Sequence, residues 1–263
     1  SIGILLLLVI PYLVKTMPLK EIQKSDRPKE ASLAPLVNGD LYYKWHQSEK
    51  HKNNGEILVL VHGLTTPSFV WGGVLEYFLE AGFKVLVYDH YGRGLSDRPR
   101  TKYTKEFYVE TLKELLQYFN IEEPVHLLGY SMGGPIIGYF ADAYPEKTRS
   151  ITLIAPAGFK INRSGFNTWF IKPIIGEWFW HVFGNRVYGV GQMSETSSSD
   201  DPRSINEEEF LENFKKQLVF SGFVESLLST IRNFNLFDAR EMYKSIGDKG
   251  IPSFVAWGTK DGV

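Results

Sequence analysis

The sequence around Ser131 decides the fold: residues 125–134 read VHLLGYSMGG. Val125–Leu128 is a short apolar run typical of a buried strand, and a helix is predicted over Gly133–Tyr144. A serine at so tight a strand-to-helix turn needs a strained backbone, and its neighbouring glycines remove the clashes of a Cβ atom. The pattern therefore predicts a Ser131 hydroxyl that projects at the carboxyl end of a sheet, above a helix N-terminus. A glycine-rich turn with an incidental serine fits the flanking strand and helix poorly.

Short apolar runs alternate with helical segments along most of the chain. This alternation implies right-handed crossovers and an α/β fold, in which helices cover both faces of a mostly parallel sheet. A hairpin through Leu41–Trp45 is expected ahead of the first parallel strand. The other strands are predicted at residues 56–61, 84–88, 151–154 and 253–257, and the other helices at about 70–80 and 104–119.

Composition divides the chain into five segments. Residues 1–14 are apolar, residues 15–35 form a polar linker, and residues 36–158 hold the first part of the α/β core. The alternation breaks over residues 159–242, which are rich in helix formers and aromatic residues and are predicted to form a cap inserted over one end of the sheet. The core is expected to resume over residues 243–263 and to lack its last strand and helix.

The N-terminal apolar run has no charge in fourteen positions. It is shorter than the ~20 apolar residues that cross a bilayer, and no small-residue cleavage site follows it. We therefore favour an uncleaved membrane anchor, such as the end of a transmembrane helix, over a signal peptide. The protein is expected to be membrane-associated, or else secreted.

Charge and cysteine content exclude several classes of function. The 29 basic and 30 acidic residues leave a formal net charge of -1, which gives no electrostatic basis for binding nucleic acid. The absence of cysteine excludes disulfides, cysteine-ligated zinc and a cysteine nucleophile. No metal-ligand spacing is visible, and no metal or organic cofactor is expected.

A second motif, His62-Gly63-Leu64, ends an earlier strand. Acyl transfer needs two backbone N–H donors aimed at the oxyanion, one from the residue after the nucleophile and one from a loop after an earlier strand. Met132 and Leu64 are the candidates. The His62 ring is expected to bond loop backbone behind the oxyanion site, because its place in the chain order disfavours a role as general base.

Two further polar segments follow strands. Asp261, after the strand at residues 253–257, is the candidate acid that orients a catalytic histidine, and a structural turn aspartate is the alternative. Asp89, Arg93 and Ser96 lie in a glycine-rich turn, where polar groups usually bond one another. We therefore expect a structural loop there, and its glycines do not complete a nucleotide-binding motif.

These motifs, V-H-G-L, Y-D-H-Y-G-R-G-L-S-D, G-Y-S-M-G-G and W-G-T-K-D, together resemble the α/β-hydrolase superfamily over roughly Leu36–Asp261. The lipase/esterase, monoacylglycerol-lipase-like and meta-cleavage-product-hydrolase branches are the most similar in style. The resemblance implies a serine hydrolase that forms an acyl-enzyme on Ser131 and carries a cap after the sixth strand. A serine at this position argues against the epoxide-hydrolase and haloalkane-dehalogenase relatives.

The cap suggests the substrate. Its aromatic residues within fifteen positions exceed what one helix face can bury, so part of them could line an acyl-chain pocket or touch a membrane. A lipid or long-chain ester is therefore the favoured substrate, ahead of a C–C bond hydrolase, a proline-iminopeptidase-type enzyme and a non-catalytic binding protein on the same fold. The pocket candidates are Trp169, Phe170, Trp178, Phe179 and His181.

The family's chain order places the base histidine after the acid, but all six histidines precede Asp261. The chain is therefore interpreted as a fragment, cut at both ends. His181, in the cap, is expected to pack or to line the rim.

We predict that these 263 residues alone are essentially inactive, because loss of the triad histidine costs ~10⁶ in kcat in subtilisin. Adding the native downstream segment should restore hydrolysis in an ester assay. Full turnover by the 263 residues that Ser131→Ala abolished would mean that another base operates.

Overall fold

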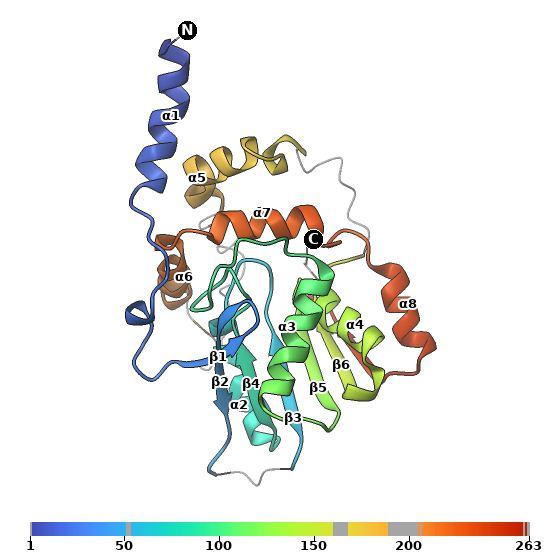
Figure 1. The fold of residues 1–263 in the computed structure, drawn as a ribbon. Coiled ribbons are helices and arrows are strands. Elements are labelled where there is room, and N and C mark those ends of the chain that lie inside the picture. Colours follow the sequence, from blue (N-terminus) through green and yellow to red (C-terminus); the bar gives the residue numbers. More distant parts are fainter. Residues whose placement is uncertain are drawn as a thin grey trace.

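The computed structural model describes residues 2–50, 54–159, 168–188, 205, 207–259 and 261. Within them, seven strands form one sheet in the order β1-β2-β4-β3-β5-β6-β7. The pairs β1–β2 and β2–β4 are antiparallel, and the remaining pairs are parallel. The predicted α/β fold with a mostly parallel sheet is confirmed (Figure 1). The strands are β1 (Ser32–Leu36), β2 (Gly39–His46), β3 (Ile57–Val61), β4 (Lys84–Tyr88), β5 (Val125–Tyr130), β6 (Thr148–Ile154) and β7 (Ser253–Ala256).

Helices cover both faces of the sheet. One layer holds α3 (Lys105–Tyr118), α4 (Gly133–Ala143) and α8 (Arg240–Asp248), which pack against one another. The other face is covered by the 3₁₀ turn η2 (Ser68–Trp71) and α2 (Gly72–Glu80), which lies behind the strands in Figure 1. Two shorter 3₁₀ turns, η1 (Lys24–Asp26) and η3 (Pro145–Lys147), precede β1 and β6.

Alternate side chains of the central strands enter two separate cores, as they must in a sheet covered on both faces. In β3, Val59 and Val61 join the core under α3 and α4, whereas Leu58 and Leu60 join the core under α2. Neither face of the strand reaches solvent, which is why the run at residues 57–61 is continuously apolar.

The predicted elements and the observed ones differ mainly at their ends. The strand predicted at 84–88 is β4, with the same bounds, and the helix predicted at 104–119 is α3. The strand predicted from Ile151 begins three residues earlier, at Thr148, because β6 pairs along the whole of β5. The helix predicted at 70–80 opens with the 3₁₀ turn η2.

A group of helices between β6 and α8 lies over the sheet and is called the cap here (Figure 1). Residues 160–167, 189–204 and 206 of the expected insertion lie outside the described residues. Arg232 of α7 forms a two-pronged ion pair with Glu177 of α5, at 2.6 and 3.1 Å, which fixes these two helices to each other. The described cap elements are η5 (Thr168–Ile171), α5 (Ile175–Tyr188), α6 (Glu207–Lys216), η6 (Gln217–Val219) and α7 (Phe223–Asn233).

The N-terminal run forms α1 (Ile2–Thr16), a helix that continues through Pro11. It rests on the cap, where the Trp178 indole donates a hydrogen bond to the Leu8 carbonyl at 2.7 Å, and its first turns project beyond the cap (Figure 1). At 1.5 Å per residue its 15 residues fall short of the ~30 Å core of a bilayer. No helix in the described part of the chain is long and apolar enough to cross a membrane.

Candidate active site

Ser131 occupies a sharp bend between β5 and α4. Its φ of +52° lies in the left-handed region that residues with a side chain rarely adopt. Three backbone hydrogen bonds of 3.0 Å hold it there: its N–H donates to the Ile154 carbonyl, and its own carbonyl accepts from the N–H groups of Gly134 and Ala157. The strained conformation is therefore fixed by the neighbouring strand β6 and the loop that follows it.

The glycines around Ser131 are required by close approach of backbone. A Cβ atom on Gly133 would lie 1.9 Å from the Val61 carbonyl oxygen, and one on Gly129 would lie 2.4 Å from the Gly133 carbonyl oxygen. Only hydrogen fits at these distances. The glycines thus allow α4 to begin directly against the carboxyl ends of β3 and β5.

The loop after β3 runs beside Ser131. A Cβ atom on Gly63 would lie 3.4 Å from the Ser131 Cβ, so this loop borders the serine side chain. In the part of the chain that the structure describes, the N–H groups of Leu64 and Met132 donate to no acceptor. Such unpaired donors are normally satisfied by water or a ligand. Here Met132 directly follows Ser131, and Leu64 belongs to the loop beside it. The arrangement is suited to binding an oxyanion.

His62 is buried behind this loop and has a structural role, as predicted. Its Nε2 accepts a hydrogen bond from the His90 N–H at 2.9 Å, so in the neutral ring Nδ1 carries the proton and donates to the Gly63 carbonyl at 2.9 Å. Burial, followed by the neighbouring His90 ring, lowers the pKa of His62 well below its ordinary value, and burial lowers the pKa of His90 to about 3. Both rings are therefore neutral at neutral pH.

Asp261 lies on the exposed turn after β7, where its N–H donates to the Gly258 carbonyl at 3.1 Å. The register of the sheet aligns Tyr130, Ile154 and Ala256 across β5, β6 and β7. The carboxyl ends of these three strands therefore lie side by side. Burial and then the Asp261 carboxylate raise the pKa of the hydroxyl of Tyr130, the residue before Ser131.

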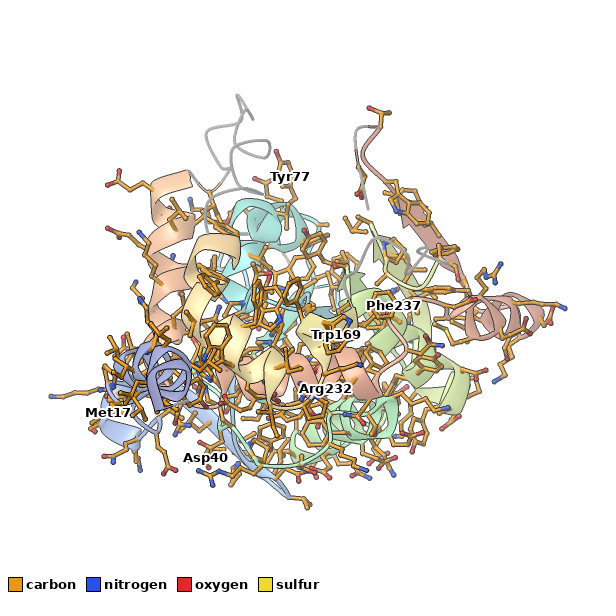
Figure 2. All side chains as sticks on the ribbon, turned by 90° about the horizontal axis from the view of Figure 1, so that it is seen from above. Met17, Asp40, Tyr77, Trp169, Arg232 and Phe237 are labelled. Carbon is orange, nitrogen blue, oxygen red and sulfur yellow. The ribbon has the colours of Figure 1, made fainter. Side chains whose placement is uncertain are left out.

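Among the described residues, no hydrogen bond or ring contact joins the five pocket candidates in the cap to Ser131. Phe170 stacks on Phe179 with ring centroids 3.9 Å apart, and Trp169 is 57% exposed in the middle of the cap (Figure 2). Trp178 bonds α1, and His181 pairs with Glu225 at 2.9 Å. Their contacts with other described residues involve the cap and α1, so their role in substrate binding stays a prediction.

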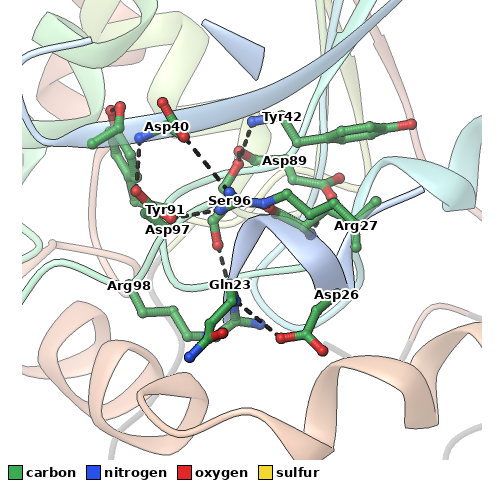
Figure 3. Close-up of polar contacts among 12 residues, drawn as sticks. Gln23, Asp26, Arg27, Asp40, Tyr42, Asp89, Tyr91, Ser96, Asp97 and Arg98 are labelled. Carbon is green, nitrogen blue, oxygen red and sulfur yellow. Dashed lines mark hydrogen bonds and ion pairs between the residues drawn. The ribbon is translucent and has the colours of Figure 1, made fainter. Parts of the chain in front are cut away.

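The glycine-rich turn after β4 bonds itself, as predicted, and it also bonds the N-terminal segment (Figure 3). The Asp89 carboxylate accepts from the N–H groups of Ser68 and Leu95 at 2.8 and 2.9 Å. The Ser96 hydroxyl donates to the Asp89 carbonyl at 2.6 Å. Arg27, from the expected linker, is buried and bonds Asp97. Both carboxylate oxygens of Asp89 are therefore engaged by backbone N–H groups, which fits a structural loop.

Sequence reasoning missed two cap residues that contact this region. Gln217 bonds the Thr65 carbonyl in the loop after β3, and Ser226 bonds the buried Arg93 side chain. Nothing in the local sequence marks either residue, because each contact joins segments more than 130 positions apart.

Comparison with known proteins identifies the family. A family model described as the alpha/beta hydrolase fold matches residues 56–263, most of the chain. The chain belongs to the alpha/beta hydrolase fold family. It is 28% identical over 138 residues to an uncharacterised protein of Mycobacterium tuberculosis, a match that covers 52% of this chain and 40% of that protein, so less than half of the relative's length is spanned.

Two other similarities cover more of this alpha/beta hydrolase. Lipase 1 of Psychrobacter immobilis is 26% identical over 261 residues, which covers 94% of this chain and 74% of the lipase. The crystal structure of the enol-lactonase from Burkholderia xenovorans LB400 superimposes with a TM-score of 0.66 at 20% identity, over 87% of this chain and 81% of that one. The second similarity supports the fold.

The close approach of Gly133 to Val61 gives a test of the alpha/beta hydrolase site. We predict that Gly133→Ala lowers the free energy of unfolding by at least about 3 kcal/mol, because its Cβ would overlap a backbone carbonyl that cannot move aside. Urea denaturation measures the change. Gly247→Ala is the control, because Gly247 is an exposed α8 residue whose Cβ would meet nothing within 4 Å; it should be neutral or stabilising by up to about 1 kcal/mol. Equal midpoints for Gly133→Ala and the unmodified protein would contradict the overlap.

Proposed function

We propose that the protein is a serine hydrolase that cleaves carboxylic esters, with lipid or long-chain esters preferred, through an acyl-enzyme on Ser131. One observation carries the proposal: a serine held in the left-handed region lies beside two N–H groups, of Leu64 and Met132, that have no acceptor among the described residues. Strain of this kind persists where the surrounding structure enforces it, and it is concentrated at active sites.

The proposed reaction follows from this geometry. The Ser131 hydroxyl attacks the ester carbonyl carbon, and the carbonyl oxygen, now negative, accepts hydrogen bonds from the Leu64 and Met132 N–H groups. Collapse of the intermediate expels the alcohol, and water then hydrolyses the acyl-enzyme. A histidine oriented by Asp261 would take the serine proton and return it to the leaving group.

The base is assigned to none of the described histidines. His62 and His90 hold each other in the core, and His126 bonds Ser150 at 2.7 Å. His181 is paired with Glu225 in the cap, and His46 lies on β2. Experiments on turnover therefore use the full-length protein as its gene encodes it.

The preference for lipid esters rests on two supports. The Psychrobacter lipase aligns with nearly all of this chain. The cap also exposes large apolar side chains, among them Trp169 and Ile174, and an acyl chain or a lipid surface would cover such groups. A panel of a monoacylglycerol, a short-chain ester, a dienoate and a proline peptide separates this substrate class from the C–C hydrolase and iminopeptidase alternatives.

We predict that Ser131→Ala lowers kcat for monoacylglycerol hydrolysis by about 10⁶-fold, following the subtilisin precedent, and abolishes labelling by a fluorophosphonate. Ser150→Ala is the matched control, because Ser150 is a half-buried serine that bonds a histidine on the neighbouring strand. It should keep turnover within a few-fold. Turnover that survives Ser131→Ala would end the proposed mechanism, and efficient cleavage of short esters alone would end the lipid assignment.

We also propose that the protein binds lipid surfaces through α1 and the outer side of the cap. Leu7, Val14 and Met17 of this N-terminal region are 74%, 63% and 77% exposed. On the cap, Ile174 is 83% exposed and has a φ of +71°, which is unfavourable for a β-branched residue. An interface that buries such side chains would offset the cost of exposing them. Because the net charge is only -1, apolar burial would supply most of the affinity.

Ile174→Glu tests this surface. Removing an isoleucine from the lipid phase costs about 1.5–3 kcal/mol, so we predict at least roughly ten-fold weaker binding to phosphatidylcholine vesicles in a flotation assay. Val37→Glu is the control: Val37 is also 83% exposed but belongs to the turn between β1 and β2. Equal losses in the two variants, or no loss in Ile174→Glu, would refute the assignment of the surface.

A further inference from the structure

The loop after β3, residues 63–65, is called the oxyanion loop here. Each of its three carbonyl groups accepts a hydrogen bond from a side chain. The Gly63 carbonyl accepts from His62 at 2.9 Å, the Leu64 carbonyl from Arg93 Nε, and the Thr65 carbonyl from Gln217 Nε2 at 2.8 Å. A trans peptide is planar, so a fixed carbonyl also fixes the direction of the N–H group across the same bond. The direction of the Leu64 N–H therefore depends on the Gly63 carbonyl, and the path of the loop beyond it depends on Arg93 and Gln217.

Gln217 belongs to the cap, yet it is only 2% exposed, and both the nitrogen and the oxygen of its amide form hydrogen bonds. While Nε2 donates to the Thr65 carbonyl, Oε1 accepts from the Gly94 N–H at 3.2 Å. A side-chain amide suits this position because it offers a donor and an acceptor side by side. One cap side chain thus bridges the oxyanion loop and the turn after β4.

Arg93 makes a second connection between the cap and the oxyanion loop. Its guanidinium is fully buried, and besides the Leu64 carbonyl it bonds the Ser226 hydroxyl of α7 and lies over the Phe223 ring, 5.5 Å from its centroid. A Cβ atom on Gly92 would lie 2.3 Å from the Ser226 Cβ, so α7 sits directly against this turn. If the cap moved away from the sheet, Arg93 would lose the Ser226 and Phe223 contacts that support its bond to the Leu64 carbonyl.

We infer that Gln217 is a positioning residue that couples the seating of the cap to the alignment of the Leu64 oxyanion donor. The inference rests on the proposed function, since it names the group that the coupling serves. When η6 and α7 are seated, Gln217 holds the Thr65 carbonyl, and Arg93, supported by Ser226, holds the Leu64 carbonyl. When they lift, the Thr65 carbonyl loses Gln217, and Arg93, which holds the Leu64 carbonyl, loses its Ser226 partner.

Gln217→Met tests the coupling, because methionine has a similar volume and cannot form either hydrogen bond. Loss of an oxyanion donor costs roughly 10²–10³ in kcat, and misalignment should cost part of that, about ten-fold or more. In the full-length protein we expect kcat for a monoacylglycerol to fall by this factor with KM unchanged. The affinity for an alkyl boronic acid, which forms a tetrahedral adduct on serine, should fall by the same factor.

Thr230→Val is the matched control. Thr230 is also a fully buried residue of the cap, and the variant removes its 2.7 Å hydrogen bonds to the Tyr108 hydroxyl of α3 and to the Ser226 carbonyl of its own helix, while both hydrogen bonds of Gln217 stay in place. It should lower the thermal midpoint while kcat and boronate affinity stay within two-fold. A Gln217→Met protein with normal kcat and boronate affinity, or a Thr230→Val protein that loses both, would overturn the inference.

If Gln217→Met folds poorly, Gln217→Glu provides a second test of the coupling. Ionised glutamate can accept from Gly94 but cannot donate to Thr65, whereas the protonated acid can do both. Burial raises the pKa of a carboxyl group, so kcat relative to the unmodified protein should rise as the pH falls. A pH-independent ratio would contradict the coupling. Turnover that survives Ser131→Ala is a separate result, and it would count against the proposed function itself.

Discussion

The candidate site depends on the approach of the α4 N-terminus to the end of β3. A Cβ atom on Gly133 would lie 1.9 Å from the Val61 carbonyl oxygen, so only glycine permits this contact. Because β3 and β5 are parallel neighbours, with Val61 opposite Gly129, the loops that follow them leave the sheet side by side. The turn at Ser131 and the loop at Gly63 meet for this reason, and the two backbone donors come with them.

The strain at Ser131 is held by the sheet on its other side. The Ser131 N–H bonds the Ile154 carbonyl at the end of β6, and Ala155, the residue after that strand, has a φ of +41° and bonds Ala256 of β7. Each residue in the left-handed region costs roughly 1–2 kcal/mol, and the hydrogen bonds across three strands offset this cost. The position of Ser131 is therefore set by the register of β5, β6 and β7 together rather than by the turn alone.

The sequence predicted the parts of the structure that local patterns encode. The strand Lys84–Tyr88 and the bend at Ser131 were predictable because apolar runs and glycine spacing act within a few residues. The start of β6 at Thr148 was missed, since it is defined by pairing with β5 across an irregularity at Val125 and His126. The Gln217–Thr65 bond spans 152 positions, and no periodicity reports such a contact.

The contacts of the aromatic pocket candidates were also beyond sequence reasoning, for a different physical reason. An aromatic cluster indicates burial against something, but its spacing does not say what. In the structure Trp178 bonds the backbone of α1, and His181 packs edge-on against Tyr12 of the same helix, 5.5 Å between ring centroids. The N-terminal run thus covers cap residues that composition alone would assign to a substrate pocket.

A second serine, Ser150, shows that a histidine and an acid nearby do not make a serine a candidate nucleophile. Its place in the sheet decides. Ser150 Oγ lies 2.7 Å from His126 Nδ1, and the Glu56 carboxylate lies 3.5 Å from the other ring nitrogen, so a serine, a histidine and an acid are in line. However, Ser150 lies within β6 directly opposite His126, near the amino end of the parallel strands. Its backbone belongs to the sheet ladder, Glu56 is also held by Arg149 at 3.0 Å, and ligands of open α/β sheets bind at the carboxyl ends. At Ser131 no histidine partner is described. However, its bend and the two N–H donors beside it lie where the strands end, and such an arrangement cannot form within a strand.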